Sequence, residues 1–167
     1  IAISLIIVDS TIVNVAIPSI VDDLGISSTQ VQWVQTSYTL VFAALLILFG
    51  TLADRAGRRR LLVVGVAVFT AASILAGLAP DGTWLIAARV IQGVGGAMVL
   101  PATMSLINAN FRGRERAMAF AVWGSVIGGM AAVWPLLGGW VTTDLSWGGG
   151  VFGHVPLRVV GIFWGVP

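Results

Sequence analysis

The feature that most constrains this chain is a cluster of arginines between two long apolar runs. Arg55, Arg58, Arg59 and Arg60 fall within the segment 50–61. Each flanking run reaches the roughly 20 residues that a helix needs to cross a bilayer. Because several guanidinium groups in so short a connection resist translocation, this connection is expected on the cytoplasmic side.

The internal pattern of this connection predicts more than its side. Gly50 is expected to end a helix, and Gly57 is expected to take a positive φ in a tight turn. Asp54 lies just past the apolar run, next to the arginines. The alternative is that the arginines only set topology, which would leave the two glycines and the aspartate unexplained.

The composition is that of a membrane protein. The 167 residues are 57% hydrophobic and only 10% charged, whereas a soluble domain carries about 25% charge. The nine Lys and Arg residues are all arginines, and most of them lie in short connections rather than spread over a water-exposed face, so no nucleic-acid partner is expected. No cysteine is present, which excludes disulfide and thiolate chemistry.

Five spans and part of a sixth are predicted within residues 1–167. They are expected at Ile1–Ile20, Val31–Leu52, Leu61–Ala79, Thr83–Ile107 and Ala117–Val141, with a sixth beginning near Val155. Acidic residues occupy the first, third and fifth connections, and arginines occupy the second and fourth. The N-terminus is therefore expected to be cytoplasmic, with Asp22 and Asp144 outside and Arg58 and Arg114 inside.

Two charged residues fall inside predicted spans. Asp9 lies on an arc with Ser10, Thr11 and Asn14. Burial penalises the ionised form of a carboxylate, so Asp9 is a candidate proton site that should face the bundle interior. The alternative is a structural carboxylate near the interface, reached by water.

The second charge, Arg89, lies about 9 Å along the fourth span from Thr83 at helical rise. At that depth it needs partners, and Gln92, Gly93 and Gly96 share its stripe of the helix. The glycines predict close approach of a neighbouring helix. The alternative is that Arg89 extends outward to the interface.

Further polar residues suggest a cavity. Ser27 and Gln30 form a predicted capping box before the second span. Candidate cavity residues are Asn14, Gln32, Gln35, Tyr38 and Gln92; hydrogen bonds that only join helices are the alternative role. The third span, with nothing more polar than Thr70 and Ser73, is expected to be a lipid-facing support.

The fifth span carries a row of small residues. Gly124, Gly128 and Ala132 form a smooth ridge on which another helix can lie closely. Pro135 is expected to bend the helix before Gly138 and Gly139. The alternative is that the row serves packing alone.

These motifs resemble those of the major facilitator superfamily. The loop motif G-x-L-A-D-R-x-G-R-R-R-L and the R-x-x-Q-G-x-G-G motif that begins at Arg89 are similar to that superfamily's second loop and fourth span. The segment D-x-T-I-V-N-V-A-x-P, from Asp9, and the glycine row ending in P-x-x-G-G resemble the fourteen-spanner drug:proton antiporters. Trp134 stands where that family has glycine, and the resemblance is poor after Trp147.

The resemblance implies an all-α, polytopic fold: an incomplete amino-terminal six-helix half of a major facilitator transporter. It implies a fragment of a proton-coupled multidrug exporter of the plasma membrane, whose partners are the lipid bilayer, protons, small lipophilic or cationic substrates and a carboxy-terminal half. The implied roles are a proton-coupling pair, Asp9 and Arg89; a gating loop, Gly50, Asp54, Arg55, Gly57 and Arg58; and an antiport helix, Gly124, Gly128, Pro135, Gly138 and Gly139.

Two other functions are considered. One is a solute:proton symporter or sugar permease of the same superfamily, against which the first-span and fifth-span motifs argue. The other is a truncated membrane protein that does not transport. An enzyme is not expected, nor a cofactor or metal, because the sequence shows no nucleophile with its base, no metal cluster and no phosphate loop.

Overall fold

The protein is described here by a computed structural model that places residues 2–144. Five helices follow one another through short connections: α1 (Ala2–Leu24), α2 (Ser28–Ala56), α3 (Arg58–Gly77), α4 (Gly82–Asn110) and α5 (Gly113–Asp144). No strand occurs in this part of the chain. The prediction of an all-α fold is therefore confirmed, while the sixth span predicted from Val155 lies outside the described residues.

Capping side chains explain where two of the helices begin. Ser27 Oγ accepts a hydrogen bond from the Gln30 N–H at 3.3 Å, and the Ser27 N–H donates to Gln30 Oε1 at 3.0 Å. This is the predicted capping box, which satisfies backbone donors that the first turn of a helix leaves without partners. Asp81 does the same for α4 by accepting from the Trp84 N–H at 2.8 Å.

The connection between α2 and α3 differs in part from the prediction. Gly57 has a φ of +97°, so the expected glycine turn is confirmed. Gly50, by contrast, does not end a helix, since α2 continues to Ala56. The reason is packing: Ala53 is fully buried beside Ala97 and Ala102 of α4, and this burial keeps the last two turns of α2 helical.

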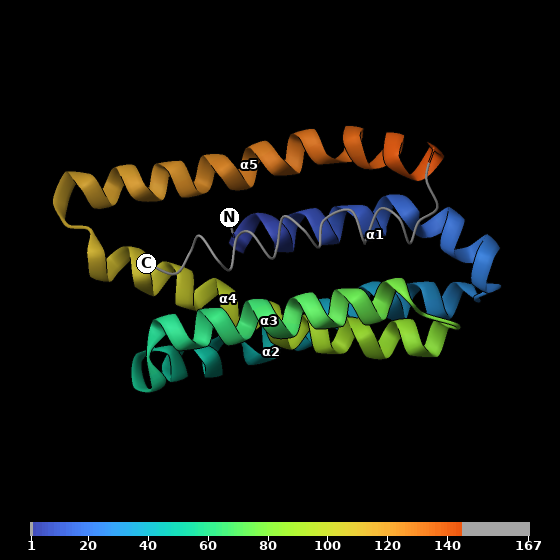
Figure 1. Ribbon diagram of the computed structural model, residues 1–167, viewed down its shortest axis with the longest axis horizontal. Helices are drawn as coiled ribbons and strands as arrows, with labels where there is room; N and C mark the ends of the chain where they lie inside the picture. Colours follow the sequence, from blue (N-terminus) through green and yellow to red (C-terminus); the bar gives the residue numbers. More distant parts are fainter. Residues whose placement is uncertain (1, 145–167) are drawn as a thin grey trace.

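The helices lie side by side as two groups (Figure 1). In one group α2 and α3 each pack along α4; in the other, α1 packs on α5. Contacts between the groups are fewer: α1 touches α4 and α2, and α5 touches α4. The structure therefore has a seam between the two groups, and α1 makes most of the contacts across it.

Glycines set the distance between helices in the first group. A Cβ at Gly93 would lie 2.8 Å from the carbonyl oxygen of Tyr38 in α2, and one at Gly95 would lie 2.7 Å from the backbone nitrogen of Phe69 in α3. Both distances are too short for real side chains. The predicted close approach at the α4 glycines is confirmed, and it draws both neighbours against one helix.

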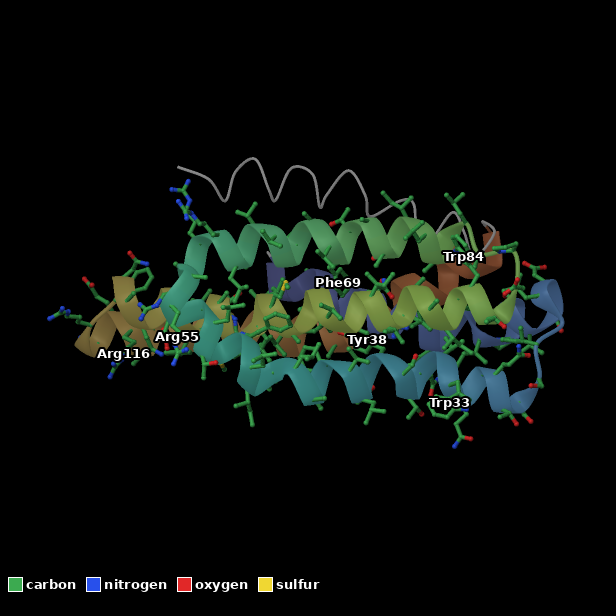
Figure 2. All side chains as sticks on the ribbon, turned by 90° about the horizontal axis from the view of Figure 1, so that it is seen from below. Trp33, Tyr38, Arg55, Phe69, Trp84 and Arg116 are labelled. Carbon is green, nitrogen blue, oxygen red and sulfur yellow. The ribbon has the colours of Figure 1, made fainter. Side chains whose placement is uncertain are left out.

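The helices α2, α3 and α4 are each long and apolar enough to cross a membrane by length and composition. Large apolar side chains cover their outer surfaces, with Ile47 of α2 being 81% exposed. Arg55 and Arg116 lie toward one end of the bundle, while Trp33 and Trp84 lie toward the other (Figure 2). This separation agrees with the positive-inside and aromatic-belt pattern of membrane proteins.

Candidate functional site

The site is built around an ion pair that joins the two groups of helices. Arg89 of α4 donates from Nη1 to Asp9 Oδ2 of α1 at 2.6 Å, and the two residues are 3% and 4% exposed. The prediction that both charges face the bundle interior is confirmed. The alternatives, an arginine that extends outward and a carboxylate reached by water, are wrong because the neighbouring helices enclose both side chains.

Several groups surround the guanidinium of Arg89. Its Nη1 donates to Gln92 Oε1 at 2.8 Å, and its Nε donates to the Val34 carbonyl oxygen of α2 at 3.2 Å. Its central carbon lies 4.3 Å from the centre of the Tyr38 ring, a cation–π contact. A buried charge is tolerated when its hydrogen bonds are satisfied, and here α1, α2 and α4 all contribute.

The other carboxylate oxygen of Asp9 faces amide and hydroxyl groups. Gln92 Nε2 lies 2.8 Å from Asp9 Oδ1 and 2.7 Å from Ser73 Oγ, which makes Ser73 of α3 a member of the network. Ser73 Oγ is in turn 3.4 Å from Asp9 Oδ1 and 2.9 Å from the Phe69 carbonyl oxygen. Four helices therefore meet at this centre.

The expectation that the third span is a lipid-facing support is wrong. Ser73 is 0% exposed, and Phe69 is 1% exposed and points into the bundle near Tyr38 (Figure 2). The sequence carries little sign of this, because a serine in any apolar helix can bond to the carbonyl oxygen four residues earlier. Its spacing does offer one signal: Gly65, Phe69 and Ser73 fall on one helix face, and all three are buried.

The predicted cavity residues separate into three settings. Tyr38 and Gln92 belong to the buried network, and Gln92 is only 1% exposed, so the expectation that it faces an open cavity is wrong. Gln35 Nε2 donates to Asn14 Oδ1 at 2.8 Å, a contact between α2 and α1. Gln32 is exposed and lies apart from the network.

A groove of about 640 Å³ occurs elsewhere, between the end of α4 and the start of α5. Its lining is mostly apolar and includes none of the predicted cavity residues; it consists of Ile107, Phe111, Glu115, Met118, Ala119, Val122, Trp123 and Val126. The polar chemistry of the described residues lies in the Asp9 network instead. No three His, Cys, Asp or Glu side chains gather into a metal site within residues 2–144.

The predicted gating residues meet α4 in its C-terminal half. Arg58 Nη2 lies 3.1 Å from Asp54 Oδ1, and the same oxygen accepts from Ser105 Oγ at 3.2 Å. Arg58 also donates to the Ser105 carbonyl oxygen at 3.4 Å. Arg55 is exposed, and a Cβ at Gly50 would meet Pro101 of α4 at an ordinary 3.9 Å. The loop is thus attached to α4 through polar contacts that water can reach.

The glycine row of α5 faces open space where it is described. No atom lies within 4 Å of a Cβ built on Gly124 or Gly128. Pro135, Gly138 and Gly139 belong to α5, but their packing lies outside the described residues, as does that of Trp134. The atypical stretch from Trp147 to His154 lies outside them as well.

Charged groups buried inside helical membrane bundles are typical of functional sites such as ion and substrate pathways, and the pair of Asp9 and Arg89 is of this kind. The chain matches the family model of the Major Facilitator Superfamily over residues 1–166. It belongs to that family.

Similar proteins include several named for drug resistance or export. The chain is 46% identical to the puromycin resistance protein of Streptomyces alboniger, over 95% of this chain and 32% of that protein. It is 41% identical to the multidrug efflux pump LfrA of Mycolicibacterium smegmatis, over 92% of this chain and 31% of the pump. It is 39% identical to the cephamycin export protein of Amycolatopsis lactamdurans, over 95% of this chain and 33% of that protein. The chain spans about a third of the length of these relatives.

Proposed function

We propose that this chain is the amino-terminal part of a proton-coupled multidrug exporter, in which Asp9 and Arg89 form the proton-coupling pair. The observation that carries the proposal is the ion pair at 2.6 Å, buried between helices of different groups. The relatives named for efflux and export support drug transport as the activity.

The chemistry of the pair supports coupling between a proton and helix movement. While Asp9 is ionised, its attraction to Arg89 holds α1 against α4 across the seam. A proton on Asp9 removes the charge of the carboxyl group and so weakens that attraction, whereas Arg89 keeps Gln92, the Val34 carbonyl and the Tyr38 ring. Proton binding would therefore weaken the contact between the groups and leave Arg89 with neutral partners only, a cost that favours rearrangement.

The remaining roles follow from this proposal. Residues 1–167 form five spans and part of a sixth of a plasma-membrane protein whose N-terminus is cytoplasmic. A carboxy-terminal half completes the substrate site, since transporters of this kind bind their substrates between two halves. The polar residues Asn14, Gln32 and Gln35 line its cavity, small lipophilic or cationic molecules are its substrates, and the loop at Asp54 and Arg58 is its gate.

The test is Asp9→Asn in the complete transporter, reconstituted in liposomes with an imposed proton gradient. Asp22→Asn, which alters an exposed acid of the same helix, is the matched control. Dye movement against the direction of proton flow should be lost in Asp9→Asn and retained in the control. An Asp9→Asn variant that exports dye at the parental rate would overturn the proposal. Dye that moves in the same direction as protons would indicate a symporter instead.

A further inference from the structure

We propose that Ser73 is a positioning residue that serves both protonation states of Asp9: its hydroxyl donates to the carboxylate and accepts from the carboxylic acid. This rests on the proposed function, because it assumes that Asp9 takes up a proton. Ser73 belongs to α3, is 0% exposed and lies 3.4 Å from Asp9 Oδ1. The geometry of the two carboxylate oxygens leads to the assignment.

The proton on Asp9 belongs on Oδ1. The other oxygen, Oδ2, accepts the charged hydrogen bond from Arg89 at 2.6 Å, and a proton there would face a cation that only donates. Oδ1 is approached by Gln92 Nε2 at 2.8 Å and by Ser73 Oγ at 3.4 Å. Both contacts are electrically neutral, so Oδ1 is the oxygen at which a proton meets less repulsion.

Of the two side chains at Oδ1, the serine is the one that can accept. Gln92 turns its Nε2 toward Asp9 because its Oε1 accepts from Arg89 at 2.8 Å, and rotating the amide would set Nε2 against the guanidinium. An amide N–H cannot receive a proton from the acid. A hydroxyl can, because it carries two lone pairs in addition to its own hydrogen.

The hydrogen-bond inventory of Ser73 matches this role. Ser73 Oγ accepts from Gln92 Nε2 at 2.7 Å and has the Phe69 carbonyl oxygen within reach at 2.9 Å. With Asp9 ionised, the hydroxyl hydrogen has both Asp9 and Phe69 as acceptors. With Asp9 protonated, the hydrogen goes to Phe69, and the second lone pair receives the Asp9 proton. The protonated state therefore fills all three hydrogen-bonding positions of the hydroxyl, whereas the ionised state fills the hydrogen and one lone pair.

Among the residues that the structure describes, charged and titratable groups face Asp9 from two other helices. Arg89 of α4 contacts it directly, and Tyr38 of α2 lies over the guanidinium. From α5, Trp123 and Ile127 pack on the cluster beside this part of α1, and neither titrates. The response of Asp9 to pH therefore depends on these groups together with Ser73.

The experiment is Ser73→Ala in the complete transporter, with the rate of proton-driven dye export measured as a function of pH. The substitution removes both the donor to the carboxylate and the acceptor for the acid. The donated bond is long, at 3.4 Å, and competes with Phe69 at 2.9 Å, so loss of the acceptor is the larger effect. The midpoint of the profile should therefore move down by about 0.5–1 pH unit, equivalent to about 1 kcal/mol. Ser125→Ala is the matched control: its hydroxyl also bonds four residues back, to Ala121 at 2.8 Å, but it is exposed on α5. The control should keep the parental midpoint.

A second variant and a spectroscopic measurement keep the proposal testable even if Ser73→Ala fails to fold. Ser73→Cys keeps the size of the side chain but accepts hydrogen bonds weakly, so it should shift the midpoint in the same direction by less. In infrared difference spectra, the carbonyl band of protonated Asp9, identified by its absence from Asp9→Asn, should shift in both Ser73 variants.

The outcomes separate the two proposals. If Asp9→Asn still exports dye with the parental dependence on pH, the proposed function fails. If that dependence is lost in Asp9→Asn while the Ser73 variants keep the parental midpoint and infrared band, the role of Ser73 is overturned and the coupling pair stands. A lowered midpoint in Ser73→Ala or Ser73→Cys, with Ser125→Ala unchanged, supports the inference.

Discussion

Replacing Gly95 by alanine should destabilise the bundle, because α3 and α4 meet through main-chain atoms at this glycine. A Cβ on Gly95 would lie 2.7 Å from the Phe69 nitrogen, 2.9 Å from Phe69 Cα and 3.0 Å from the Gly65 carbonyl oxygen. All three atoms belong to the backbone of α3, so rotation of a side chain cannot relieve the overlap.

The distances give the size of the effect. Ordinary van der Waals contact begins at 3.4 Å, so the helices must separate locally by roughly 0.7 Å, a gap that forfeits about a quarter to a half of the attraction between facing atoms. Over-packing of this kind costs about 1–3 kcal/mol. A cost of about 2 kcal/mol lowers the melting temperature of a chain of this size by about 4–8 °C.

The assay is thermal unfolding followed by circular dichroism of the protein in detergent. Gly128→Ala is the matched control, because it is the same substitution within a helix and no atom lies within 4 Å of the new Cβ. Any gain in helix propensity is common to both variants, so the difference between their melting temperatures isolates the α3–α4 contact. Equal melting temperatures would refute the close contact between the two backbones.

Three further predictions concern topology, the gate and a helix cap. Single cysteines at Arg114 and Asp22 of this cysteine-free chain should react with a membrane-impermeant reagent in intact cells at Asp22 only, and labelling at Arg114 would reverse the proposed orientation. Asp54→Asn should change the melting temperature by less than about 4 °C, because an exposed ion pair contributes at most about 1 kcal/mol. The same variant should slow export by the complete transporter. An unchanged export rate would show that Asp54 is not part of the gate. Asp81→Ala should cost about 1 kcal/mol through loss of the α4 cap, and Asp81→Asn, which keeps a capping oxygen, should recover most of it; equal unfolding free energies for the two variants would contradict a capping role.

Much of the fold follows from the sequence because apolar runs and their caps are local signals. At the start of the helix Ser28–Ala56, for example, Ser27 and Gln30 predict a capping box, and the structure has it. The boundaries are less accurate, since an apolar run marks what can lie in lipid and not where hydrogen bonding stops. At the end of α2, burial of Ala53 against α4 extends the helix past the apolar run, and that contact joins residues far apart in the chain.

The site was predictable where its residues are costly in a membrane. Asp9 and Arg89 stand out because a charge inside an apolar run needs a partner. Their pairing joins residues 80 positions apart, and periodicity within one helix carries no information on such a contact. Ser73 gave no comparable signal, because a serine whose hydroxyl bonds to its own helix costs little free energy in lipid or in the protein interior.

The position of the network at the seam would give the proposed proton on Asp9 a directed effect. Arg89, Gln92 and Ser73 come from α3 and α4, whose separation is fixed by the backbone contact at Gly95. Asp9 alone among these four residues comes from α1, which packs mainly on α5 and also contributes apolar residues to a cluster with α2, α3 and α4. Protonation at Asp9 therefore alters an attraction between the two groups while leaving the contacts that hold α3 to α4 intact.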